Sequence, residues 1–209
     1  MQVGNATLFL QRAKRKLRDL VFSNESDSYV APDMTILAEH ITEGGITAFA
    51  YQQEPDSVAW TVRTDGVLSC MTYRREEQVV AWHRHIIGGV FGSGNAIVES
   101  IAVIPGDVDE DEVYMIVKRT INGATKRYVE RLSGFDFGTD VSNAFFVDSG
   151  LTYSGSAATT ISGLDHLEGQ TVSVLADGSI HPNVTVSSGA VTLQRSVTKA
   201  HIGLSLIHI

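Results

Sequence analysis

The sequence predicts a mainly β protein in which antiparallel, propeller-like blades are followed by a small β-barrel or sandwich domain, with one short helix. Three observations support this fold class. Apolar and polar residues alternate at a period of two over much of the chain. Asp-Gly and Asn-Gly pairs separate neighbouring runs, as in tight hairpins. A strand, a loop and a hairpin occur twice, at a spacing of 55 residues.

The first segments of the chain predict a hairpin and then a helix. In "ATLFLQRAKRKLRDLVFS", apolar residues precede and follow a basic turn, which favours a hairpin over the alternative of a helix. "APDMTILAEHI" is the best helix candidate. Pro32 breaks the preceding segment, Asp33 can cap the helix, and Ile36, Leu37 and His40 or Ile41 would share one side.

Two blade-like units are expected within residues 1–135. In the first, a strand from Ile46 precedes a hairpin with strands near 58–62 and 68–72 around Thr64-Asp65-Gly66. In the second, a strand from Val98 precedes a hairpin with strands at 113–118 and 125–132 around Asn122-Gly123. Repeated antiparallel units of this kind are typical of β-propellers.

The remainder of the chain predicts a linker and a second domain. Residues 136–158 are rich in Gly, Ser, Thr and Asp, as expected of a linker. Residues 159–203 contain short apolar runs separated by Asp177-Gly178 and Ser188-Gly189, which predicts a small β-domain. The last six residues, 204–209 ("LSLIHI"), resemble translated sequencing adapter, so we exclude them from the fold and expect the chain to be truncated.

Composition narrows the class of protein. The chain has 209 residues, 43% of them hydrophobic and 19% charged, as in folded globular proteins. Its net charge of -8 argues against general binding to nucleic acid or to an anionic membrane. Cys70 is the only cysteine, so neither a disulfide framework nor a site built from several thiolates is expected. No apolar run is long enough for a transmembrane helix.

The stretch "VVAWHRH" is the segment most like a chemical site. His83 and His85 are two residues apart, so on a strand both would point to the same face, as two metal ligands could. No third ligand is evident, because His40, His166 and His181 lie in unrelated contexts. The interpretation we favour is a structural strand with Trp82 and Arg84 on one face and the histidines on the other.

Three further motifs also favour structural interpretations. The acidic loop Asp107–Glu112 lacks the glycine and the final glutamate of a calcium loop. The glycine-rich stretch Gly88–Asn95 lacks the residues that complete a phosphate-binding loop, so a flexible connection between the blades is favoured. The basic run Arg12–Arg18 could contact phosphates, but a solvated hairpin tip is favoured. No catalytic, cofactor-binding or metal-binding residue is therefore assigned, and no cofactor is expected.

Longer stretches carry a family resemblance. They include "YVAPDMTILAEHI", "AYQQEPDSVAWTVRTDGVL", "VESIAVIPG", "VKRTINGATKRYVERL", "FFVDSGLTYSG" and "ISGLDHLEGQTVSVLADG". In this order, and together with "VVAWHRH", they resemble the tail nozzle proteins, also called tail tubular protein B-like, of short-tailed bacteriophages. The resemblance covers nearly all of residues 4–203.

The resemblance implies a virion structural protein without catalytic residues. Its members form a ring, hexameric in the family, that lies below the tail adaptor and continues the channel for DNA ejection. The implied partners are copies of the chain itself, the adaptor and DNA in transit, and no membrane anchor is implied. Family members are longer than this chain. The alternative hypothesis is a tail-associated β-protein that binds or degrades glycans, and a further alternative is a propeller enzyme that uses His83 and His85 as ligands.

Overall fold

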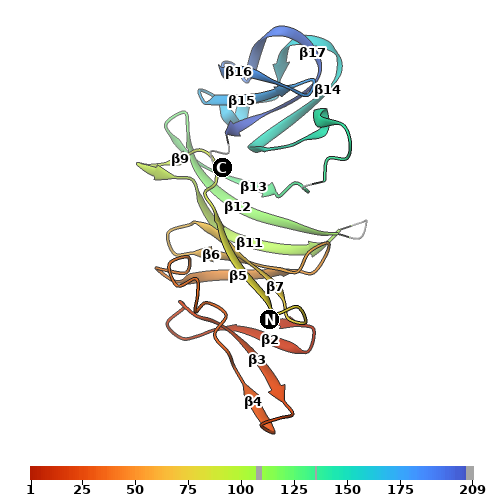
Figure 1. The fold of residues 1–209 in the computed structure, drawn as a ribbon. Coiled ribbons are helices and arrows are strands. Elements are labelled where there is room, and N and C mark those ends of the chain that lie inside the picture. Colours follow the sequence, from red (N-terminus) through yellow and green to blue (C-terminus); the bar gives the residue numbers. More distant parts are fainter. Residues whose placement is uncertain (107–109, 135, 206–209) are drawn as a thin grey trace. The chain divides into compact units, whose positions relative to one another are not determined.

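The computed structural model describes residues 1–106, 110–134 and 136–205, with the side chain of residue 205 left out, and is built almost entirely of antiparallel strands (Figure 1). The mainly β prediction is therefore confirmed. The chain divides into two compact units. Unit 1 comprises Met1–His85 and Ile97–Val117, and unit 2 comprises Ile86–Ala96 and Lys118–Ile209.

Unit 1 begins with two four-stranded meanders. The first has the order β1-β2-β3-β4 (Gln2–Val3, Ala6–Leu10, Leu17–Ser23 and Ser28–Val30), and the second has the order β5-β6-β7-β8 (Ile46–Gln52, Val58–Arg63, Leu68–Arg74 and Val79–His85). The predicted N-terminal hairpin is confirmed as β2–β3, which pair with Leu10 opposite Leu17. The hairpin predicted around Asp65-Gly66 is confirmed as β6–β7, and Gly66 has the positive φ, 80°, that the turn requires.

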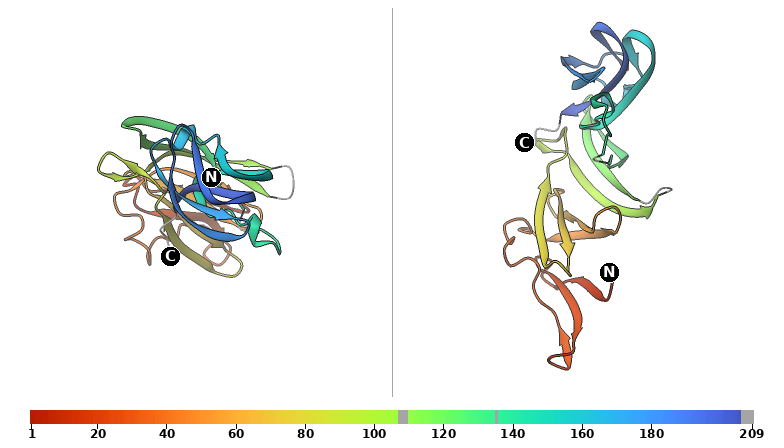
Figure 2. Two further views of the ribbon diagram at one scale, coloured as in Figure 1. Left: turned by 90° about the horizontal axis from the view of Figure 1, so that it is seen from above. Right: turned by 45° about the vertical axis from the view of Figure 1, so that its right-hand side comes forward.

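The two meanders of unit 1 share a hydrophobic cluster. Leu8 and Leu17 from the first meander pack with Ala59, Met71 and Tyr73 from the second, and all five side chains are buried. In the right-hand view of Figure 2, the red N-terminal strands lie next to the orange strands of the second meander. Since antiparallel partners point to the same face, Ala59, Met71 and Trp82 must lie on the face of the second meander that meets this cluster.

A three-stranded sheet has the order β11-β12-β13 (Ile97–Pro105, Asp111–Ile121 and Ala124–Arg131). It confirms the second predicted strand and hairpin, and Asn122 and Gly123 both have positive φ, as a type I′ turn requires. The glycine-rich stretch, expected to be a flexible connection, instead forms a short ribbon of β9 (Val90–Phe91) and β10 (Gly94–Asn95).

The small β-domain of unit 2 is a four-stranded sheet in the order β14-β17-β15-β16 (Val147–Ser162, Ala190–Ser205, Thr171–Ala176 and Ser179–Thr185). Both long strands are irregular in their pairing, with shifts of register near Ser154 and Ala158. The sheet curves around a core of thirteen buried apolar side chains that includes Leu164, Leu167 and Ile202. No sheet of the described residues closes into a barrel.

The predicted short helix is wrong. Residues 34–37 and 39–41 are turns, and the helices in the described part of the chain are two short 3-10 helices, Val141–Asn143 and Asp165–Leu167. Asp33 does accept a hydrogen bond from the backbone N–H of Thr35, at 2.9 Å, but the helix does not continue. Ile41 is buried, but Ile36 and Leu37 are 69% and 92% exposed, so most of the apolar side that should have held a helix against a core faces solvent.

The compact units differ from the predicted domain boundaries. The segment 136–158, expected to be a linker, contains the first twelve residues of β14. Its many Ser, Thr and Gly residues form strand there because β14 pairs along its length with the apolar strand β17. Leu204, part of the predicted artefact 204–209, pairs with Asp148, whereas residues 206–209 lie outside the described residues.

No helix in the described ranges is both long and apolar enough to cross a bilayer.

Candidate functional site

The histidines of "VVAWHRH" lie on β8, the last strand of the second meander in unit 1. Cys70 on β7 pairs directly with His83, and Leu68 pairs with His85. Trp60 on β6 pairs with Cys70 in turn, so one row across the sheet consists of Trp60, Cys70 and His83. The prediction that both histidines share one face of a strand is confirmed by this register.

The side chains of Cys70, His83 and His85 are in mutual contact. The Cys70 Sγ atom lies 3.1 Å from Nδ1 and 3.2 Å from Nε2 of His83. The His83 Nδ1 atom lies 3.0 Å from Nε2 of His85, and the two rings meet edge to face. One donor atom from each residue falls within 4.8 Å of the other two. Across the described ranges 1–106, 110–134 and 136–205, no other trio of Cys, His, Asp or Glu donors gathers in this way.

The three residues differ in their access to solvent. Cys70 is fully buried, His85 is half-buried and His83 is exposed. Burial raises the pKa of the Cys70 thiol above its usual range, because a buried thiolate would lack solvation. Although His83 is exposed, the neighbouring sheet partly desolvates its ring, and this lowers its pKa and favours the neutral imidazole. The cluster thus places a buried, uncharged thiol beside an exposed imidazole.

Trp82 supports the structural role predicted for the other face of β8. Its indole N–H donates to the backbone carbonyl of Met34 at 2.8 Å, and its ring packs against the cluster shared by the two meanders. This face therefore anchors β8, while the opposite face presents the two histidines. A single strand performs both roles because successive side chains alternate between faces.

Cys70 is the potential ligand that sequence reasoning missed. The lone cysteine excludes a site with several thiolates, but a single thiolate can be combined with histidines. The predicted strands could have indicated Cys70 as a ligand, because a hairpin of β7 and β8 brings it close to the histidines. Once β7 and β8 pair with Arg74 opposite Val79, Cys70 is necessarily opposite His83. The missing information was this register, which residue spacing alone does not give.

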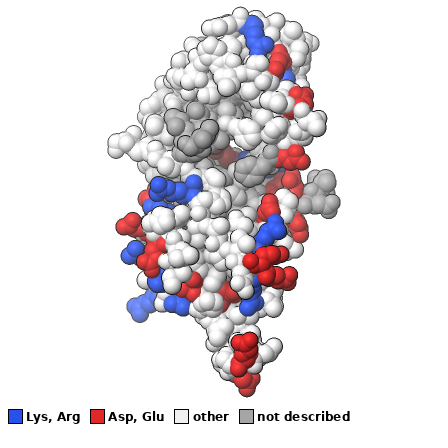
Figure 3. All heavy atoms as spheres, in the orientation of Figure 1, with Lys and Arg blue, Asp and Glu red and all other residues white. Residues whose placement is uncertain are grey.

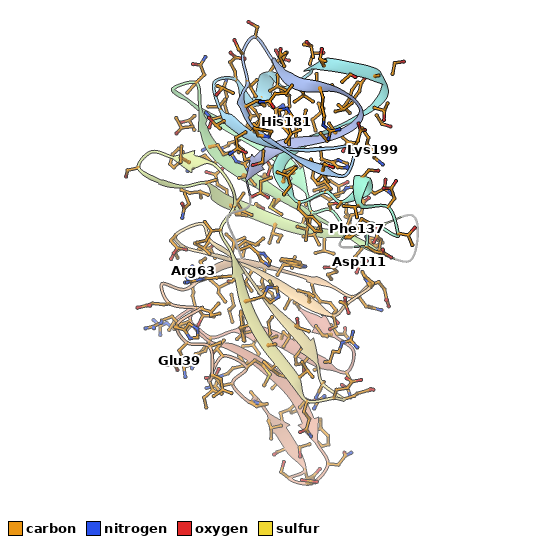
Figure 4. All side chains as sticks on the ribbon, turned by 45° about the horizontal axis from the view of Figure 1, so that its top comes forward. Glu39, Arg63, Asp111, Phe137, His181 and Lys199 are labelled. Carbon is orange, nitrogen blue, oxygen red and sulfur yellow. The ribbon has the colours of Figure 1, made fainter. Side chains whose placement is uncertain are left out.

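The remaining histidines named in the sequence do not join the cluster. His40 is exposed in the turn region that replaces the predicted helix. His166 and His181 belong to unit 2, where Figure 4 places His181 among the strands of the small β-domain. The Nε2 atom of His181 accepts a hydrogen bond from the Gln194 N–H at 2.9 Å, and its Nδ1 lies 2.7 Å from the Pro182 carbonyl. These contacts show a buried histidine with a structural role.

The other motifs have local structural roles where they are described. Asp107, Val108 and Asp109 of the acidic loop lie outside the described residues. Asp111 of the same loop, labelled in Figure 4, accepts hydrogen bonds from the backbone N–H groups of Gln53 and Glu54 at 2.7 and 3.1 Å. Arg12, Lys14 and Arg15 are exposed in the connection between β2 and β3, as predicted for a hairpin tip.

Comparison with known proteins adds no relative. No protein-family model and no curated protein sequence matches the chain.

Proposed function

We propose that this chain is a structural component of the tail of a short-tailed bacteriophage. It would form part of the nozzle ring that continues the DNA-ejection channel. Its partners would be copies of itself and the tail adaptor, its location the virion, and its role assembly rather than catalysis. The ordered stretches that resemble tail nozzle proteins, from residue 4 to residue 203, motivate the proposal.

The strand arrangement supports this proposal. The β5-β6-β7-β8 meander is a four-stranded antiparallel sheet, the form taken by a propeller blade, and the β11-β12-β13 sheet repeats the strand-and-hairpin order. We interpret these two sheets as a partial propeller-like platform. We interpret the β14–β17 sheet as a small sandwich-like or barrel-like domain of the same protein.

An exposed apolar stripe on unit 1 is the structural observation that carries the proposal. Leu20, Phe22 and Tyr29 lie on one face of the β3–β4 pair, and Phe22 and Tyr29 form an edge-to-face pair with centroids 5.4 Å apart. Phe22 is 46% and Tyr29 72% exposed. Large apolar side chains grouped in this way mark surfaces that other proteins cover. A ring provides such a cover between neighbouring subunits.

The charge of the surface is compatible with transit of DNA. The net charge is -8, so the chain as a whole repels the phosphate backbone. On the face drawn in Figure 3, basic and acidic side chains both occur near the edges of the lower half, with a broad uncharged area between them. A surface on which acidic and basic side chains are interspersed adheres weakly to DNA. Weak adhesion is what a conduit for DNA requires.

Quantitative mass spectrometry of gradient-purified particles tests this function. Particles produced from the genome that encodes the chain should contain it at the copy number of one closed ring, a hexamer by resemblance. A replication protein from the same genome is the matched control and should be absent. Recovery of the chain only from the soluble lysate would refute the proposal, and selective retention on a glycan column would favour the glycan-binding alternative.

A further inference from the structure

One face of the β7–β8 strand pair carries Cys70, His83 and His85, whose side chains all have metal-binding donor atoms. Cys70 provides a sulfur, and each histidine provides an imidazole nitrogen. They are held by paired strands rather than by loops, since Cys70 is directly opposite His83 and His85 follows on the same face. Ligands on paired strands keep their spacing, so the donor set is largely preorganised.

Two of the three distances between these donors are close to those that one ion would impose. Zinc bonds of about 2.3 Å to sulfur and about 2.0 Å to nitrogen, in tetrahedral geometry, separate neighbouring ligands by roughly 3.3 to 3.6 Å. The Cys70 Sγ and His83 Nδ1 atoms are 3.1 Å apart, and His83 Nδ1 and His85 Nε2 are 3.0 Å apart. The Cys70 and His85 donors lie within 4.8 Å of each other, so an ion shared by all three ligands also requires this pair to adjust to the separation of about 3.5 Å.

One adjustment of His83 is also required. The Cys70 sulfur is almost equidistant from both ring nitrogens of His83, so the ring must turn to direct one lone pair at an ion shared with the sulfur. His83 is exposed on the last strand of its sheet, where the ring has room to turn. Its exposure also gives the ion a route from solvent to the buried sulfur.

We propose that Cys70, His83 and His85 form a binding site for a thiophilic first-row cation, with Zn²⁺ as the ion that this donor set fits. One thiolate and two imidazoles match the borderline softness of Zn²⁺, whereas Mg²⁺ and Ca²⁺ require oxygen ligands. On binding, the Cys70 S–H bond is replaced by an S–Zn bond and the proton leaves to solvent. Three protein ligands leave a fourth position for water.

A bound ion would cross-link strands β7 and β8. β8 has one neighbour in its sheet, β7, and the ion would join β8 to β7 through side chains as well as backbone hydrogen bonds. This inference is independent of the proposed tail function, because it rests on the geometry of unit 1 alone. A tail protein that binds no metal would support the tail function and contradict the metal site. A metal-binding protein that is absent from the tail would do the reverse.

Titration of the full chain with Co²⁺, a spectroscopic substitute for Zn²⁺, tests the proposal. A thiolate-to-cobalt absorption band should saturate at one equivalent, and Zn²⁺ should abolish it. His83→Gln and His85→Gln should each weaken binding by about tenfold or more, because each loses one of three ligands. The matched control is His40→Gln, which makes the same chemical change at an exposed histidine of the same unit and should leave binding unchanged.

A second measurement covers the possibility that a variant folds poorly. Zn²⁺ should raise the unfolding temperature of the wild-type chain in a concentration-dependent way, since a ligand that binds only the folded state stabilises it. The same Zn²⁺ concentration should raise the unfolding temperature of His85→Gln clearly less than that of wild type, once metal-free folding of the variant is verified by tryptophan fluorescence. Absence of the thiolate band, or equal binding by wild type and both histidine variants, would overturn the proposal.

Discussion

Tyr73 on β7 donates a hydrogen bond of 2.7 Å from its hydroxyl group to the Asp19 carboxylate on β3, so the two meanders of unit 1 are joined by a buried polar contact. Asp19 is 3% exposed, and its second carboxylate oxygen has no hydrogen-bond partner. Arg75 provides a further charge, with its Nε atom 3.6 Å from the same oxygen that Tyr73 contacts. The Tyr73 hydroxyl is therefore closer to the buried Asp19 carboxylate than Arg75 is, and it donates the hydrogen bond that stabilises the carboxylate.

Tyr73→Phe should destabilise unit 1 by about 1 to 3 kcal/mol, because it leaves a buried carboxylate oxygen without its donor. Both tryptophans of the chain, Trp60 and Trp82, belong to unit 1, so urea unfolding followed by tryptophan fluorescence reports on this unit. Tyr29→Phe is the control at an exposed tyrosine and should change the unfolding free energy by less than about 0.5 kcal/mol. Equal stability of the two variants would show that the Asp19 contact contributes nothing.

The ion pair between Arg119 and Glu130 in unit 2 gives a second prediction. Arg119 is fully buried, contacts both carboxylate oxygens of Glu130 and donates from Nε to the Gly88 carbonyl at 2.8 Å. Glu130→Ala should cost about 3 to 5 kcal/mol, since it leaves a buried guanidinium without a counter-ion.

Hydrogen exchange measured by mass spectrometry on the β12–β13 peptides should show this loss as faster exchange. Lys126→Ala, at an exposed position of β13, is the matched control and should leave the exchange unchanged. Protection in Glu130→Ala as high as in the control would contradict the importance of the ion pair.

The ion pair between Asp33 and Lys16 should make the unfolding free energy of unit 1 depend on pH. Burial would raise the pKa of Asp33, but hydrogen bonds from Lys16, at 2.8 Å, and from Thr35 outweigh it and lower the pKa from 3.8 to about 2. A depressed carboxyl pKa stabilises the folded state above the unfolded-state pKa, and this stabilisation is lost as the pH falls toward 2.

Asp33→Asn should therefore be less stable than wild type by about 1 kcal/mol at pH 6, a value reduced by solvent screening at the partly exposed Lys16. Urea unfolding at a series of pH values should show this difference narrowing below pH 4 and disappearing only below about pH 2, the pKa of the folded state. A difference that stays constant across the series would mean that the carboxylate charge has no role.

Gly66, in the β6–β7 turn, allows a test of local geometry. A Cβ atom at this position would lie 2.3 Å from Cγ2 of Ile97, and the backbone has a φ of 80°. Gly66→Ala should therefore combine the cost of a positive φ, about 1 to 2 kcal/mol, with a steric clash of a further 1 to 3 kcal/mol.

Gly4→Ala is the matched control, because Gly4 also has a positive φ but a Cβ atom there would have nothing within 4 Å. Tryptophan fluorescence should report a larger loss of unfolding free energy for Gly66→Ala than for Gly4→Ala. Equal losses would show that Ile97 moves aside without cost.

The hairpins were predictable from the sequence because their signals are local. Asp65-Gly66 and Asn122-Gly123 each fix a turn, and alternating residues on both sides define the strands. The failed helix at 33–41 had a capping residue and spaced apolar residues, but Ile36 and Leu37 face solvent while Ala38 and Ile41 are buried, so the predicted apolar side is covered only in part. Burial depends on distant parts of the chain, and the spacing of residues does not show it.

The candidate cluster was predictable only in part, for a related reason. The i, i+2 spacing placed His83 and His85 on one face, as the structure confirms. The third donor, Cys70, comes from a neighbouring strand, and its position depends on the register of β7 against β8. β14 illustrates the same limit, since its polar sequence became a strand through pairing with β17.

Immunogold electron microscopy of intact particles tests the central claim, a place in the phage tail, most directly. An antibody raised against the purified chain should label the distal end of the short tail and should no longer do so after competition with the free chain. An antibody to the major capsid protein provides the positive control for labelling of the same particles. Label confined to the capsid or to side fibres, or no label on particles whose capsid control is positive, would contradict a nozzle role.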